Sequence, residues 1–320
     1  MRQTLLPGTQ LNVSVLGLGC WAFGGQYWGD DVRDEDSVAT IHAALDAGIT
    51  LFDTAPLYGQ GHADRVLRRA LGPRIREVVV ATKVGVRPQG RDGHAESDLR
   101  PEHILADAEA SLQRLGLERI DLLQIHWPCQ YGTPLSESLG ALETLQAQGK
   151  IRTFGLCNYG VEALREARGL APVATLQTPY SLLRREAEGG LDRACEALGV
   201  GLIAYEPLCR GLLSGRLLRE RIQYPASDLR SRDDRFLGAW LRHNLALVGD
   251  LDRAAQRLGV PTAALSLGWV LSRPRIAAAL VGAKRPAQLR EDIQALRLLD
   301  KARVWGVVDQ IAAIHGGWSP

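Results

Sequence analysis

The sequence has no apolar run approaching the ~18 consecutive residues of a membrane-spanning helix. The sequence also lacks an excess of either charge, because 38 Lys and Arg residues are balanced by 36 Asp and Glu residues, a net charge of +2. Such a balance does not favour nucleic acid or an anionic membrane as a partner. The first residues, MRQTLLPGTQLNVS, contain no apolar stretch long enough for a secretory signal. We therefore expect a soluble protein whose partners are small molecules.

Cysteine is scarce and its spacing carries no pattern. The five residues are odd in number, widely scattered and free of CxxC pairs: Cys20, Cys129, Cys157, Cys195 and Cys209. Neither a disulfide framework nor a zinc site is indicated. A reducing cytoplasm is the compartment we predict.

Short apolar runs alternate with helical periodicity along the whole chain. The predicted strands are Val15–Gly19, Thr50–Thr54, Val78–Thr82, Asp121–His126, Thr153–Cys157, Thr175–Thr178, Gly201–Tyr205 and Ala279–Val281. The predicted helices include Asp36–Ala47, Pro101–Leu115, Leu135–Gln148, Val161–Arg168, Ala187–Leu198 and Pro286–Leu299. Strands that alternate with helices are typical of parallel sheets, and eight repeats favour a closed (β/α)8 barrel.

Two further segments complete this α/β prediction. Arg2–Val13 is expected to form a small β-hairpin around Pro7 and Gly8 that caps the bottom of the TIM barrel. The charged stretch from about Arg210 to Arg242, after the seventh strand, has little regular pattern, which favours a functional lid over the mouth. No composition break divides the chain, so we predict one domain over residues 1–320.

The run GLGCWA, from Gly17 to Ala22, matches the GxGxxA form of the dinucleotide fingerprint. That fingerprint needs a helix to open directly after the glycines, so that its N-terminus meets phosphate. The following FGGQYWGDD does not favour a prompt helix. We interpret the glycines instead as residues that let a loop turn over the barrel mouth.

Polar side chains gather at the ends of the predicted strands, where barrel enzymes carry their active sites. Asp53 ends the second strand, Tyr58 follows it, Lys83 ends the third and His126 ends the fourth. Singly, each of these residues has an ordinary structural interpretation, but together they converge on one mouth. The later strands add Asn158, Gln177, Tyr180 and Tyr205.

The four converging groups fit together as a tuned proton donor. A tyrosine, with a reference pKa near ~10, protonates a developing alkoxide more readily when a nearby cation such as Lys83 favours its ionised form. Asp53 is placed to keep the lysine charged, and His126 can orient a carbonyl group. One carboxylate and one histidine with a lysine between them make a poor cation site, so no metal is predicted.

The chain resembles the aldo-keto reductase family over almost its whole length. The resemblance rests on six motifs in family order and spacing: FDTAPLYG, ATKVG, DLLQIHWP, FGLCNY, YEPLCRGLLSGR and GAKRPAQLRED. It is greatest with the bacterial general-stress-protein type of reductase. The resemblance implies an enzyme that reduces aldehydes and ketones with NADPH, with Tyr58 as general acid, Lys83 and Asp53 as its electrostatic support, and His126 orienting the substrate.

The resemblance also implies where an extended nicotinamide dinucleotide binds. The family's cofactor residues carry over to Cys20, Trp21, Asp53, Asn158, Gln177, Tyr205, Glu206, Pro207, Leu208, Cys209, Arg210, Arg216, Arg230, Gly282, Ala283, Lys284, Arg285, Gln288 and Asp292. By that carry-over Asn158 and Gln177 hold the carboxamide, and Tyr205 stacks on the ring. An apolar substrate pocket is expected from Trp21, Trp28 and Trp127, with Tyr27 less strongly indicated.

Several positions depart from the family pattern. Cys157 and Glu206 stand where many members have serine, and Ala63-Asp64 replaces a frequent Ser-Glu. Gln288 takes the place of an arginine that grips the 2′-phosphate in other branches, and Asp292 that of a common asparagine. Lys284, Arg285 and Arg230 still offer three cations, which favours NADPH over NADH. The alternative function is a nicotinamide-sensing regulatory subunit of a partner protein, similar to channel β-subunits.

Overall fold

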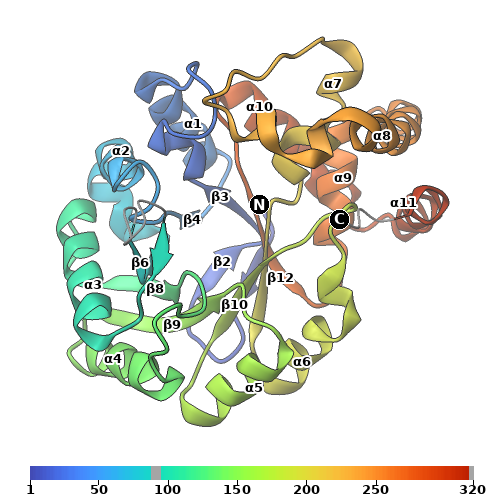
Figure 1. The fold of residues 1–320 in the computed structure, drawn as a ribbon. Helices are drawn as coiled ribbons and strands as arrows, with labels where there is room; N and C mark the ends of the chain where they lie inside the picture. The colour runs from blue at the N-terminus through green and yellow to red at the C-terminus, as the bar shows by residue number, and fades with distance from the viewer. Residues whose placement is uncertain (88–94, 317–320) are drawn as a thin grey trace.

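A closed barrel of parallel strands forms the centre of the protein (Figure 1). The computed structural model describes residues 1–87 and 95–316. The barrel strands are, in order, β3 (Leu16–Gly19), β4 (Leu51–Asp53), β5 (Val79–Val84), β8 (Ile120–Ile125), β9 (Ile151–Cys157), β10 (Thr175–Pro179), β11 (Gly201–Tyr205) and β12 (Ile276–Val281). Strand β12 pairs back to β3 and closes the ring. The eight predicted strands and the (β/α)8 architecture are confirmed.

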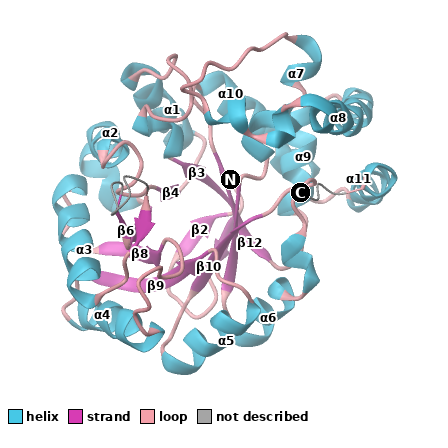
Figure 2. Ribbon diagram, viewed as in Figure 1, coloured by secondary structure: helices cyan, strands magenta, loops and turns pink. Residues whose placement is uncertain are grey.

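Helices surround the strands on the outside of the barrel (Figure 2). They are α1 (Asp34–Asp46), α2 (His62–Leu71), α3 (Pro101–Leu115), α4 (Leu135–Ala147), α5 (Val161–Leu170), α6 (Leu191–Leu198), α8 (Gly238–Leu258), α9 (Thr262–Leu271), α10 (Pro286–Ile293) and α11 (Ala302–His315). Within the described residues no helix combines the length and apolar character that crossing a membrane requires.

Two predicted helices are shorter than the sequence suggests. Gly190, with φ of 143°, separates a 3-10 turn over Glu186–Gly189 from α6, so the predicted Ala187 start is wrong. The predicted helix Pro286–Leu299 is also too long, because α10 ends at Ile293 and the chain continues as a 3-10 turn over Gln294–Leu298. The apolar periodicity continues across both junctions, which is why it does not reveal them.

The N-terminal segment is a hairpin of β1 (Gln3–Leu5) and β2 (Asn12–Ser14), as predicted. Its apolar residues Leu6 and Val13 are fully buried and belong to the same cluster as Leu51 and Leu122 inside the barrel. Burial of one such side chain stabilises the fold by about 1.5–3 kcal/mol. The hairpin therefore plugs the end of the barrel opposite the strand ends that carry polar groups.

Gly17 and Gly19 lie within β3, so our interpretation of them as loop glycines is wrong. A Cβ atom on Gly17 would stand 2.7 Å from Cδ2 of Leu280 and 3.0 Å from Cδ2 of Leu51. The glycine is needed because leucines from neighbouring strands occupy that space in the narrow barrel interior. The strand leads into a 3-10 turn over Trp21–Gly24, and no α-helix opens on the glycines.

The stretch after β11 contains four short helical segments, η4 (Cys209–Ser214), α7 (Arg216–Arg219), η5 (Leu229–Arg232) and η6 (Asp234–Phe236). Helix α8 begins at Gly238, so the predicted irregular stretch to Arg242 is too long. Side chains of Asp228 and Asp233 cap η5 and η6, each accepting from a backbone N–H two residues later. Such local caps order a segment that has no apolar periodicity.

Candidate active site

A cavity of about 400 Å³ opens at the carboxyl ends of the barrel strands. Its size is that of a ligand pocket, and the active sites of (β/α)8 barrels lie at this end of the barrel. Its lining residues are Gly19, Trp21, Ala22, Trp28, Asp53, Leu57, Tyr58, His126, Trp127, Asn158, Gln177, Arg184, Tyr205, Glu206, Pro207, Leu208, Arg210, Gly211, Arg216, Arg230, Leu280, Val281, Gly282, Lys284 and Gln288.

Asp53 and Lys83 form a buried ion pair below the cavity. Nζ of Lys83 donates to Oδ1 of Asp53 at 2.5 Å, and the two side chains are 1% and 4% exposed. The ammonium group also donates to the carbonyl oxygen of Thr54 at 3.0 Å. Burial lowers the pKa of Lys83, but the negative charge and hydrogen bond of Asp53, together with Tyr58 and Cys157, more than offset burial, and the pKa lies above its ordinary value. The lysine is therefore charged at neutral pH.

Tyr58 lies in the turn after β4, above this ion pair. Its hydroxyl oxygen is 3.3 Å from Nζ of Lys83, and the lysine lies 5.1 Å from the centre of its ring. Burial raises the pKa of Tyr58, and the lowering effect of Lys83 does not offset it. The cation acts in the direction expected from the sequence, yet the phenol stays firmly protonated in the free protein.

His126 follows β8, and its ring lies beside that of Tyr58. The two rings meet edge to face with their centres 6.1 Å apart. Burial and then the positive charge of Lys83 hold the pKa of His126 well below its usual 6.5. The imidazole is consequently neutral at physiological pH and can donate one N–H to a ligand oxygen.

Two glutamines hold the second oxygen of Asp53, which the sequence does not predict. Nε2 of Gln177 donates to Oδ2 of Asp53 at 2.9 Å, and Nε2 of fully buried Gln124 approaches the same atom at 3.4 Å. Gln177 is the residue expected to bind the carboxamide. In the structure its amide nitrogen instead completes the hydrogen bonding of the buried carboxylate.

Asn158 connects two more of the predicted residues. Its Nδ2 donates to the carbonyl oxygen of His126 at 3.0 Å, and its Oδ1 accepts from the hydroxyl of Tyr205 at 2.8 Å. Asn158 has φ of 65°, an uncommon conformation for a residue other than glycine. The strained backbone at the end of β9 thus places an amide between two strand ends beside the cavity.

The turn that carries Tyr58 packs directly against the 3-10 turn after β3. A Cβ atom on Gly24 would lie 2.6 Å from the carbonyl carbon of Tyr58 and 2.6 Å from the nitrogen of Gly59. No real side chain tolerates that distance, so the two backbones can meet only through glycine. Gly24, in the segment FGGQYWGDD that follows the fingerprint match, therefore helps to position Tyr58.

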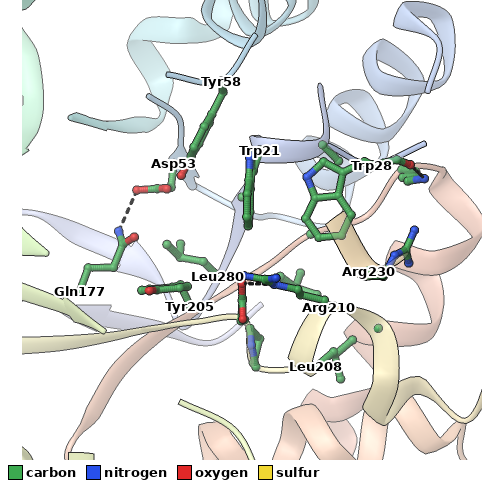
Figure 3. A pocket seen from close by; sticks show the side chains of 18 of the residues that line it. Trp21, Trp28, Asp53, Tyr58, Gln177, Tyr205, Leu208, Arg210, Arg230 and Leu280 are labelled. Atoms are coloured by element: carbon green, nitrogen blue, oxygen red, sulfur yellow. Dashed lines mark hydrogen bonds and ion pairs between the residues drawn. The ribbon is translucent and has the colours of Figure 1, made fainter. Parts of the chain in front are cut away.

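Cations collect at the opposite end of the cavity (Figure 3), where Arg230 lies across Trp21 and Trp28 from Tyr58 and Asp53. Arg210, Arg216 and Lys284 also line the cavity. Arg210 lies 5.7 Å from the ring centre of Trp21 and donates to Glu206 at 2.7 Å. Positive charge at one end and a proton donor at the other suit a long anionic ligand.

Most predicted cofactor residues line the cavity, but five do not. Cys20, Cys209, Ala283 and Asp292 are buried with side chains directed into the protein, and Arg285 lies on the rim. A motif match fixes the position of a backbone segment but not the direction of each side chain. The lining residues that the sequence did not indicate are Gly19, Ala22, Leu57, Arg184, Gly211, Leu280 and Val281.

Of the aromatic residues predicted for a substrate pocket, Trp21, Trp28 and Trp127 line the cavity. Trp21 and Trp28 meet edge to face at 5.1 Å, and Trp21 stacks beside Tyr58 at 6.1 Å. Tyr27 lies outside, 44% exposed, in a neighbouring surface groove. The aromatic wall adjacent to Tyr58 is therefore made of tryptophan.

Across the described residues no group of three His, Cys, Asp or Glu side chains could hold a metal ion.

Comparisons with known proteins agree on one family. Residues 15–313 match the model of the aldo/keto reductase family. Aldo-keto reductase YhdN of Bacillus subtilis (strain 168) is 36% identical over 293 residues, which cover 90% of this chain and 87% of that protein. The NADH-specific methylglyoxal reductase of Escherichia coli (strain K12) is 33% identical over 317 residues, 93% and 94% of the two chains.

A solved structure is similar over nearly the full length. The glycerol dehydrogenase AKR11B4 from Gluconobacter oxydans superposes with a TM-score of 0.88 at 37% identity, covering 99% of this chain and 98% of that one. The barrel and its polar mouth are those of an oxidoreductase that acts on carbonyl compounds with a nicotinamide cofactor. The chain belongs to the aldo-keto reductase family, which confirms the resemblance seen in the sequence.

Proposed function

We propose that the protein reduces aldehydes and ketones to alcohols, with NADPH as the preferred hydride donor and Tyr58 as the proton donor. The observation that carries the proposal is the position of the Tyr58 hydroxyl, which faces the cavity 3.3 Å from the charged amine of Lys83. A carbonyl oxygen that becomes an alkoxide beside this phenol can take its proton.

Each member of the group has a separate task. Tyr58 gives its proton to the substrate oxygen, and Lys83 stabilises the phenolate that remains. Asp53 keeps Lys83 charged inside the barrel, and neutral His126 donates a hydrogen bond that orients the carbonyl. When bound, the nicotinamide supplies the hydride that adds to the carbonyl carbon.

The residues present fit a nicotinamide dinucleotide. Asn158 and Gln177 carry amides at the Tyr58 end, Tyr205 offers a ring face, and the cationic end suits phosphate groups. Nε1 of Trp28, a lining side chain, is buried and has no hydrogen-bond partner among the described residues. An unsatisfied buried donor is costly, and a ligand acceptor that reached it would satisfy it.

The preference for NADPH rests on Arg230 and Lys284 in the cavity wall and on Arg285 at its rim, since a 2′-phosphate is bound best by several cations. A relative is named as NADH-specific, so both cofactors belong in the test.

We also propose that residues 1–320 form one domain, because strands from Leu16 to Val281 belong to one barrel. A cytoplasmic location stays a prediction.

Loss of nicotinamide absorbance in the presence of a panel of aldehydes and ketones tests the proposal. We expect turnover with NADPH and slower turnover with NADH, fastest for substrates with an apolar group that can lie against Trp21, Trp28 and Trp127. Tight cofactor binding without turnover on any carbonyl would contradict the proposal and would favour a nicotinamide-sensing regulatory subunit.

A further inference from the structure

We propose that Asp31 is a specificity-determining residue that limits the preference for NADPH, because its carboxylate occupies the cations that a 2′-phosphate needs. This inference rests on the proposed function, since it concerns the adenosine end of the same cofactor site. Asp31 lies in the loop between β3 and α1, and the cofactor motifs do not include it.

The carboxylate of Asp31 bridges two of the three predicted phosphate ligands. Its Oδ1 accepts from Nζ of Lys284 at 2.8 Å, and its Oδ2 accepts from a terminal nitrogen of Arg285 at 3.2 Å. Lys284 also donates to the carbonyl oxygen of Trp28. Two positions separated by more than 250 residues in the chain thus meet at the cationic end of the cavity.

The third cation is paired as well. Arg230 donates from two nitrogens to the carboxylate of Asp228, at 2.9 and 2.6 Å, and its guanidinium lies 4.1 Å from the ring centre of Tyr224. Burial and then the proximity of Arg230 lower the pKa of Lys284, whereas Asp31 acts to raise it. Lys284 and Arg230 thus each have a carboxylate partner while no phosphate is present.

The same carboxylate treats the two cofactors differently. A ribose 2′-hydroxyl, as in NADH, can donate to a carboxylate, which is the way many dinucleotide sites select NADH. A 2′-phosphate carries about two negative charges and cannot share the two cations with Asp31 without repulsion. NADPH must displace the Asp31 side chain, and that cost reduces the benefit of the cations.

The Asp31 side chain can be displaced without movement of the loop between β3 and α1. The amide of Leu229 donates to the carbonyl oxygen of Tyr27 at 2.9 Å, and the hydroxyl of Ser227 donates to Asp30 at 3.0 Å. These bonds hold the loop after β3 against the segment after β11 independently of Asp31. Side-chain rotation of Asp31, which is 53% exposed, is sufficient.

Calorimetric titration with two nucleotides isolates this effect from catalysis. Adenosine 2′,5′-bisphosphate carries the 2′-phosphate and AMP carries the 2′-hydroxyl, and neither reacts. We expect Asp31→Asn to tighten the bisphosphate on the order of tenfold without tightening AMP, because one repulsive charge is removed. Asp31→Glu keeps the charge and should retain the wild-type ratio. Asp30→Asn is the matched control on the neighbouring position, because its side-chain oxygen can still accept from Ser227, and it should leave both affinities within about twofold.

The outcomes distinguish the inference from the proposed function. Equal affinity ratios in the wild-type and Asp31→Asn proteins would overturn the role of Asp31, whatever the enzyme reduces. No binding of either nucleotide to the wild-type protein would overturn the cofactor site itself. A shifted ratio in a protein that reduces no carbonyl with either cofactor would support Asp31 and contradict the proposed function. In an active enzyme, the NADPH-to-NADH ratio of kcat/KM should rise on the same order in Asp31→Asn.

Discussion

Gln177 donates from Nε2 to Oδ2 of Asp53 at 2.9 Å and so connects strands β10 and β4 across the inside of the barrel. The other oxygen of Asp53 receives the charged amine of Lys83. A buried carboxylate is tolerated only when its oxygens are well hydrogen-bonded. The proposed proton-donor group is therefore supported from a strand on the far side of the ring, as well as by its neighbours.

Replacement of Gln177 by leucine tests this cross-barrel support. Gln177→Leu should lower the free energy of unfolding by about 1–3 kcal/mol, because it takes a donor from a buried carboxylate. Urea denaturation measures the change. Gln146→Leu is the matched control, since that amide donates to the carbonyl oxygen of Arg152 at the surface, and its effect should stay within about 0.5 kcal/mol. Equal effects of the two substitutions would contradict the role given to Gln177.

The ion pair of Asp53 and Lys83 should behave as one unit in unfolding experiments. Asp53→Asn and Lys83→Met should each cost about 3–5 kcal/mol, because each leaves an uncompensated buried charge. The double variant should be less destabilised than the sum of the two. The surface pair of Arg165 and Glu162, 58% and 85% exposed, should show coupling below about 0.5 kcal/mol in the same cycle. Additive costs at the buried pair would count against mutual neutralisation.

Gly24→Ala should impair catalysis more than folding. The added methyl group must push away the backbone at Tyr58 and Gly59, and displacement of a proton donor by about 1 Å costs on the order of 100-fold in rate. We expect a large fall in kcat with little change in cofactor affinity. Gly140→Ala, in α4 with open space around the new methyl group, should leave kcat unchanged and stabilise by up to about 1 kcal/mol. An unaltered kcat in Gly24→Ala would refute the positioning role.

Sequence reasoning succeeds where the signal is local and periodic. The apolar runs that end in Asp53, Lys83 and His126 reveal strands, and parallel strands in a barrel bring their ends together. The resemblance supplies the cofactor segments, but it does not say that the side chains of Cys209 and Asp292 face the interior. Cys209 lies in a strained turn with φ of 49°, and Asp292 lies on the buried side of α10, and composition reveals neither.

Two other features could not be predicted because nothing local marks them. Gln124 lies inside an apolar strand, where a polar residue is easily interpreted as marking a sheet edge or a turn. Its partner, Asp53, lies on another strand. Asp31 lies in a loop rich in aspartate, and its partner Lys284 is far along the chain. The first contact needs β4, β5 and β8 to lie side by side, and the second needs β12 to pair with β3.

The pH dependence of reduction follows from the directions of the pKa shifts. His126 has a lowered pKa, so it is neutral at pH 6.5 and above, whereas Tyr58 and Lys83 have raised values and stay protonated. We expect kcat/KM for reduction to be flat from about pH 6.5 to about 9.5. Unfolded His126 takes up a proton near its ordinary pKa of 6.5, so stability should decrease as pH falls below that value. An acid limb centred near pH 6.5 that disappears in His126→Asn would contradict a neutral imidazole.

The central claim is that Tyr58 delivers the proton, and Tyr58→Phe tests it most directly. The variant keeps the ring, its contact with Trp21 and its edge-to-face contact with His126, and it loses the hydroxyl alone. Steady-state reduction of an aldehyde that the wild-type protein accepts should fall by about 100- to 10,000-fold, because general acid catalysis is lost. NADPH affinity measured by tryptophan fluorescence should stay within about threefold, since the proposed cofactor contacts lie on other residues. A Tyr58→Phe protein that binds NADPH normally and retains wild-type kcat would contradict the account.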